Sequence, residues 1–161
     1  MDEKKDDKKE KDFKEGIDKQ NADLRKNLED SEKYWNDSIE SLSKRLIKPV
    51  NETIQLQAEA ISLRQILTEE IKNMSYQIFK FKQKMKGYEK DRLEWYILQF
   101  PAKATSGEKA KMIEGELAAY QYRLDIFDVH INFLRETQKD IDNINFAVKN
   151  KITLFQLTEM E

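Results

Sequence analysis

Lysines with few acidic neighbours lie in one stretch near the middle of the chain, unlike the lysines of the mixed-charge N-terminal segment. Five lysines of this middle stretch follow one another closely: Lys80, Lys82, Lys84, Lys86 and Lys90. In a helix, which turns by about 100° per residue, Lys82, Lys86 and Lys90 form one row, and Lys80 and Lys84 lie on the other side of the apolar stripe. Like charges four residues apart repel, which favours an anionic partner. The alternative is a solvated face without a partner.

Residues for catalysis or metal binding are scarce. The chain has no cysteine, and its one histidine is His130, so thiolate sites and histidine-based triads are excluded. Carboxylate pairs such as Glu69 with Glu70, and Asp125 with Asp128, fall on predicted exposed helix faces without a further ligand. We therefore expect no enzyme activity, no metal and no cofactor, and we interpret His130 as an interface or core imidazole.

The composition indicates a chain of long exposed helices. Of 161 residues, 37% are charged, while only 4 are Gly and 2 are Pro, which is typical of an all-α protein. No apolar stretch approaches the roughly 18 residues of a membrane span, and the N-terminus is charged where a signal peptide would be apolar. We expect a soluble cytoplasmic protein without membrane contact, in the host cytoplasm if a phage encodes it.

The first third of the chain divides into two predicted segments. Residues 1–18 are almost entirely charged, with both signs mixed, and we predict a disordered tail because nothing there can be buried. Residues 19–48 carry apolar side chains every three or four positions, which predicts a thin amphipathic helix and a possible partner arm. Pro49 ends that helix, because it disfavours the helical conformation of the residue before it.

Residues 49–161 are predicted to form a long antiparallel helical hairpin. Apolar residues spaced by threes and fours run from Leu56 to Trp95 and again from Ile113 to Ile141. Between these runs, Thr105 and Glu108 have the spacing of a capping box, which starts the second helix. We expect a break near Asn143 and Asn145, followed by a short C-terminal helix.

The apolar stripes of this hairpin look too wide for one thin helix to cover, so we predict a homo-oligomer. The expected interface residues lie on the second hairpin helix and its terminal segment: Phe127, Ile131, Leu134, Phe146 and Val148.

Charge is unevenly distributed along the hairpin. Residues 72–111 contain ten basic and four acidic side chains, whereas residues 112–161 contain five basic and nine acidic ones. Tyr88, Trp95 and Tyr96 follow the lysines and could stack on unpaired bases, although Tyr88 and Trp95 occupy apolar-stripe positions and are better explained as core.

Two segments of the chain resemble the UvsY-type recombination mediators of T-even-like bacteriophages. Residues 90–96 (Lys-Asp-Arg-Leu-Glu-Trp-Tyr) are similar to that family's Lys-x-Arg-Leu-acidic-aromatic-Tyr pattern. Residues 145–152 (Asn-Phe-Ala-Val-Lys-Asn-Lys-Ile) are similar to the element that begins its terminal helix. The resemblance covers about residues 52–157 and departs from the family at residues 97–101 and at Asn145.

The resemblance implies a ring-like homo-oligomer that binds single-stranded DNA and loads a RecA-like recombinase onto DNA coated by single-strand-binding protein. Lys90 and Arg92 occupy the family's DNA-contacting positions, and the preceding lysines extend that surface. The competing interpretation is a structural coiled-coil scaffold or interaction protein that does not bind nucleic acid. A third interpretation is a basic amphipathic surface for anionic membranes.

Overall fold

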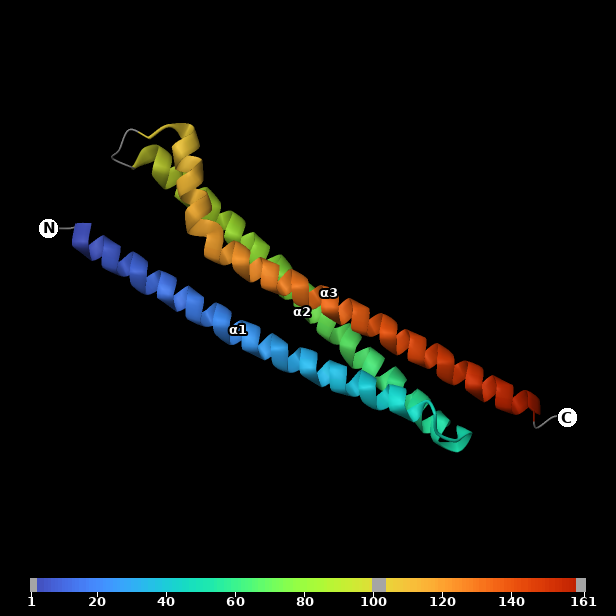
Figure 1. Ribbon diagram of the computed structural model, residues 1–161. Coiled ribbons are helices and arrows are strands. Elements are labelled where there is room, and N and C mark those ends of the chain that lie inside the picture. The colour runs from blue at the N-terminus through green and yellow to red at the C-terminus, as the bar shows by residue number, and fades with distance from the viewer. Residues whose placement is uncertain (1–2, 100–103, 159–161) are drawn as a thin grey trace. The chain divides into compact units, whose positions relative to one another are not determined.

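Three long helices make up the described chain, and it contains no strand. The computed structural model describes the backbone of residues 3–99 and 104–158, and the side chains of these residues except 3–15 and 51. The helices are α1 (Glu3–Arg45), α2 (Val50–Leu98) and α3 (Ser106–Thr158) (Figure 1). The predicted all-α fold is confirmed.

The boundary between α1 and α2 lies where the proline predicts it. The chain turns after Arg45, and α2 begins directly after Pro49. The carbonyl oxygen of Pro49 accepts a hydrogen bond from the Glu52 amide at 3.1 Å and another from the Thr53 hydroxyl at 3.1 Å. Pro49 thus contributes an acceptor to the first turn, where its missing amide proton costs nothing.

The start of α3 is the predicted capping box. The Glu108 amide donates to the Thr105 hydroxyl at 3.3 Å, and the Thr105 amide donates to the Glu108 carboxylate at 2.7 Å. The backbone hydrogen bond from Thr105 lowers the pKa of Glu108. Two amides that the helix itself cannot pair are satisfied in this way.

Each helix contributes one segment to each of two compact units. Unit 1 comprises Met1–Asn27 and Tyr76–Asp128, and unit 2 comprises Leu28–Ser75 and Val129–Glu161. Within unit 1, α2 and α3 form an antiparallel hairpin (Figure 1).

In unit 2 all three helices share one hydrophobic core. Its buried members come from α1, α2 and α3: Trp35, Leu42, Leu56, Ala60, Leu67, Leu134, Ile141, Ile144 and Val148. Burying a large apolar side chain contributes about 1.5–3 kcal/mol, so this cluster dominates the stability of the unit. The segment 28–45, which belongs to the predicted separate helix 19–48, is therefore an integral part of this core. A further role as a partner arm stays a prediction.

Lys151 of α3 satisfies the free carbonyl groups that follow α1. Its ammonium donates to the carbonyl oxygen of Leu46 at 2.8 Å and also to that of Lys48. A cation at the C-terminal end of a helix is favoured by the helix dipole as well as by these hydrogen bonds.

In unit 1 the core is rich in aromatic rings. Tyr96, Ile113 and Leu117 are buried, and four partly buried residues pack against them: Met85, Tyr88, Trp95 and Tyr120. The rings of Tyr88 and Tyr120 lie 5.5 Å apart between their centroids. The hairpin of unit 1 is thus joined by aromatic contacts between α2 and α3.

The predicted break near Asn143 and Asn145 is wrong, because α3 continues without interruption to Thr158. Ile141, Ile144 and Val148 are all buried at three- and four-residue spacing across these positions. An Asn inside a helix costs only a fraction of 1 kcal/mol relative to the best helix formers, which is less than the gain from burying these side chains. The separate short C-terminal helix is therefore absent from the described part of the chain.

Helix α1 begins at Glu3, within the predicted tail of residues 1–18. The disorder of that tail in solution stays a prediction.

Candidate nucleic-acid interface

The lysines singled out by their spacing lie on α2 in unit 1. All five side chains are exposed: Lys80, Lys82, Lys84, Lys86 and Lys90. None of them forms an ion pair with a residue whose side chain the structure describes. We call these residues the lysine face. Its charge is left to solvent or to an anionic partner.

Arg92 differs from these lysines, because its charge is neutralised inside the protein. Its guanidinium pairs with the Glu116 carboxylate through two hydrogen bonds, from Nε and from Nη2, each at 2.5 Å. The guanidinium also lies over the rings of Trp95, at 4.5 Å, and Tyr96, at 5.1 Å. Glu116 therefore already balances the charge that a DNA phosphate would otherwise meet. These contacts favour a structural role, and the predicted DNA contact of Arg92 stays a prediction.

Glu116 is the centre of a polar network between α2 and α3. Besides Arg92, it accepts hydrogen bonds from the hydroxyl groups of Tyr96, at 2.8 Å, and Tyr88, at 3.3 Å. Burial alone would raise the pKa of Glu116, but the hydrogen bonds from Arg92, Tyr96 and Tyr88 together outweigh it and lower the pKa. The pKa of Arg92 is raised in turn, chiefly by its hydrogen bond to Glu116.

Sequence reasoning missed Glu116, although a signal was present. Glu116 lies three residues after Ile113 and four before Tyr120, which are both on the apolar stripe of the second hairpin helix. An acidic residue at a stripe position needs a partner across the hairpin, and Arg92 occupies such a position on α2.

The aromatic residues expected near the lysines are mostly committed to the core. Tyr96 is buried, and Tyr88 and Trp95 pack against the same cluster. Two other rings on α2 are exposed instead: Tyr76, at 57%, and Phe79, at 59%. The ammonium of Lys80 stands over the Tyr76 ring, 4.5 Å from its centre. The exposed rings therefore lie among the first lysines of the face.

Four of the five predicted interface residues are buried within their own chain: Phe127, Ile131, Leu134 and Val148. Because the chain itself covers them, these four residues need no second copy for their burial, and the predicted interface stays a prediction. Trp35 and Leu42 of α1 share the core with two of these residues, Leu134 and Val148. Phe146 alone of the five remains available, with 66% of its surface exposed.

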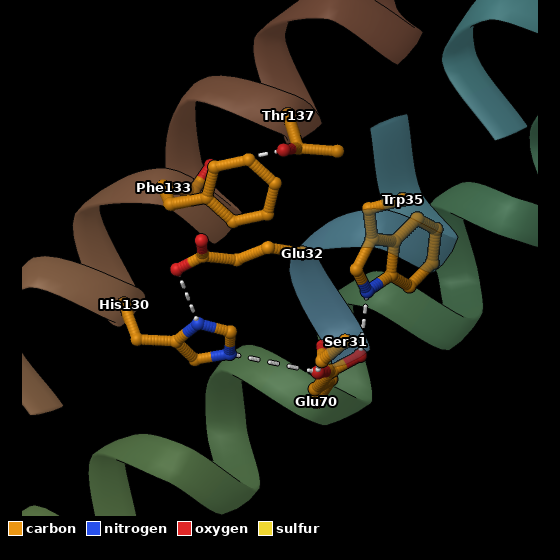
Figure 2. Close-up of polar contacts among 7 residues, drawn as sticks. All are labelled: Ser31, Glu32, Trp35, Glu70, His130, Phe133 and Thr137. Atoms are coloured by element: carbon orange, nitrogen blue, oxygen red, sulfur yellow. Dashed lines mark hydrogen bonds and ion pairs between the residues drawn. The ribbon is translucent and has the colours of Figure 1, made fainter. Parts of the chain in front are cut away.

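His130 lies in a polar cluster to which all three helices of unit 2 contribute (Figure 2). The ring is only 1% exposed, and its Nδ1 lies 3.2 Å from the Glu32 carboxylate of α1. On the other side its Nε2 lies 3.9 Å from Glu70 of α2. That carboxylate accepts hydrogen bonds from the Trp35 indole at 2.8 Å and the Ser31 hydroxyl at 2.7 Å. The imidazole thus belongs to the core.

This cluster does not extend to a metal site. Over the residues that are described, no group of three or more acidic, histidine or cysteine side chains is arranged to hold a metal ion. In the same part of the chain, no helix has an apolar stretch long enough to cross a membrane.

No protein-family model, curated protein or solved structure matches this chain.

The Glu116 network predicts a stability that depends on pH. In the unfolded chain Glu116 takes up its proton near its ordinary pKa of 4.5, whereas the folded protein keeps it ionised to lower pH. The stabilising contribution of the ionised Glu116 is therefore complete when the pH is above the pKa of the unfolded chain, and it is lost as the pH falls through the lowered pKa of the folded protein. Glu116→Gln should reduce stability at neutral pH by about 1–3 kcal/mol and should flatten the acid limb of the stability curve.

Urea unfolding followed by circular dichroism between about pH 7 and about pH 3 measures both effects. Glu114→Gln is the matched control, because Glu114 is exposed on the same helix. Equal pH dependence in wild type and Glu116→Gln would contradict the assignment.

Proposed function

We propose that this protein binds single-stranded DNA through the lysine face and acts, as a homo-oligomer, in recombination. The observation that carries the proposal is the set of five exposed lysines on one helix without ion-pair partners among the described side chains. Phosphates would relieve the repulsion among these lysines and release counterions from the strand. Binding of this kind is independent of base sequence.

The exposed rings favour single strands over duplex. Aromatic side chains stack on unpaired bases, which a duplex keeps paired and stacked. Tyr76 and Phe79 are exposed beside Lys80 and Lys82, so a strand that meets the ammonium groups would find rings within reach of its bases.

The mediator role is proposed from the resemblance of residues 90–96 and 145–152 to the phage family. In this role the protein would hold DNA covered by single-strand-binding protein and help a RecA-like recombinase assemble on it. Oligomerisation would multiply weak contacts of individual lysines through avidity. No catalytic step is required.

A structural scaffold is the second candidate. It is favoured by apolar side chains that remain exposed near the end of α3: Phe146, Leu154, Phe155 and Leu157. Such residues favour protein contacts, and they are compatible with either function.

DNA binding is tested by replacing three lysines of the face. The triple variant Lys82→Gln, Lys86→Gln and Lys90→Gln should keep its helical circular dichroism, because all three side chains are exposed. If each lysine contacts one phosphate, the slope of log K against log salt should shrink by about 0.7 per contact, hence by about 2 per protomer. Fluorescence anisotropy with labelled oligo(dT) at several salt concentrations measures this slope.

The matched control replaces three exposed lysines outside the face, Lys26, Lys33 and Lys149, by Gln. It changes the net charge equally and should leave the slope nearly unchanged. If both variants bind as the wild type does, the lysine face is not the DNA site; if the wild type itself does not bind oligo(dT), the DNA proposal fails and the scaffold takes its place.

Base stacking is tested by Phe79→Ala. Loss of one stacking ring should cost about 1–3 kcal/mol of single-strand affinity and leave the weaker duplex affinity unchanged. Leu93→Ala is the control, because Leu93 is exposed on the same helix and has no ring. A Phe79→Ala variant that loses neither affinity would show that bases do not stack there.

The homo-oligomer is tested by light scattering at micromolar concentration. We expect a mass several times that of one chain, and we expect Phe146→Ser to shift it towards the monomer, because Phe146 is an exposed ring. A wild-type protein that is entirely monomeric would contradict the proposal.

A further inference from the structure

Two residues of the lysine face, Lys80 and Lys84, also belong to a second cationic feature of unit 1, on the side of α2 that faces α1. It is a cleft of about 290 Å³ between α1 and the α2–α3 hairpin. Its lining residues come from all three helices: Gln20, Leu24, Gln77, Lys80, Phe81, Lys84, Arg123 and Phe127. Three of these are cations, two are amides and none is acidic.

Arg123 is held in this cleft by neutral groups. Its Nε donates to the side-chain oxygen of Asn21 at 2.7 Å, and its Nη2 donates to that of Gln20 at 3.2 Å. The guanidinium also lies over the Phe81 ring, 5.4 Å from its centre. These contacts orient the group, and among the described side chains it pairs with no carboxylate, unlike Arg92. Its remaining N–H groups are donors for an anion.

Asn21 itself is fixed in place. It is only 3% exposed, and its side-chain nitrogen donates to the carbonyl oxygen of Ala119 at 3.2 Å. The amide oxygen that receives Arg123 is therefore set by a contact between α1 and α3. The buried amide thus holds the Arg123 guanidinium in one orientation at the cleft.

Lys80 and Lys84 add two point charges to the same cleft, one helical turn apart on α2. Both are exposed and have no ion-pair partner among the described side chains. The described lining of the cleft contains three cations and no carboxylate, which favours an anionic ligand. The rings of Phe81 and Phe127, with centroids 6.1 Å apart, supply an apolar wall.

We propose that this cleft binds a phosphate ester group, with Arg123 donating hydrogen bonds to its oxygens and Lys80 and Lys84 neutralising its charge. Its size is near the lower limit of ligand sites, about 300 Å³, which fits a phosphate with an attached sugar or base but not a large cofactor. The ester is either one phosphodiester of a single strand, in which case the inference rests on the proposed function, or a free nucleotide. In the first case the strand passes from the lysine face over α2 towards α1.

The test uses the full chain with two probes, labelled oligo(dT) and dTMP. Lys84→Gln should weaken binding of the probe that occupies the cleft about tenfold, the equivalent of one charged hydrogen bond. For oligo(dT) the salt slope should also shrink by about 0.7. Lys111→Gln, an exposed lysine outside the cleft, is the matched control and should match the wild type.

Arg123→Gln should have a larger effect, but it also removes the contacts to Asn21 and Gln20. The NMR signal of the Arg123 Nε–H group in the wild-type protein therefore provides an independent readout. A shift with oligo(dT) alone identifies the strand as the source, and a shift with dTMP as well identifies a nucleotide site. If neither probe shifts this signal, the proposal is wrong.

The two proposals can fail separately. If Lys84→Gln binds both oligo(dT) and dTMP like the wild type while the triple variant of the lysine face loses oligo(dT) affinity, DNA binding stands and the phosphate site in the cleft is wrong. If the wild type binds no oligo(dT), the proposed function fails, and the dTMP titration alone decides whether the cleft binds phosphate esters.

Discussion

The fold depends on the burial of one narrow apolar stripe of α1 between α2 and α3 in unit 2. Trp35 and Leu42 are fully buried there together with residues from both other helices. A hairpin of α2 and α3 alone would leave its wide apolar stripes exposed to solvent. In unit 2, α1 covers these stripes within the same chain. In unit 1, α2 presents the lysine face to solvent together with exposed rings such as Tyr76 and Phe79.

The cations of α2 and α3 include two groups. Some meet a partner within the chain, and others meet no carboxylate among the described side chains. Arg64 pairs with Asp142, Arg92 pairs with Glu116, and Lys151 meets carbonyl oxygens. Each of these cations meets its partner on another segment of the chain. The lysine face and Arg123 meet no carboxylate among the described side chains. A residue of the second group gains most from an external anion, since its charge is otherwise balanced only by solvent and mobile ions.

Polar contacts add a constraint that apolar packing lacks. Leucine and isoleucine stripes tolerate sliding by one helical turn, whereas the hydrogen bonds of Glu70 to Trp35 and Ser31 require one alignment of α1 against α2. His130, between Glu32 and Glu70, ties α3 to the same point. Buried polar clusters of this kind specify a unique arrangement of helices that would otherwise pack in several registers.

Local features were determined by the sequence itself: the all-α fold, the helix boundary at Pro49, the capping box of Thr105 and Glu108, and the exposure of the lysines. Each depends on residues within about one helical turn, where propensity and periodicity act directly. Only the tertiary structure decided the partner of Arg92, the continuity of α3 through Asn145, the burial of Phe127 and the orientation of Arg123 by Asn21. These contacts join residues far apart in the chain, and periodicity shows that a side chain faces inward without showing what it will meet.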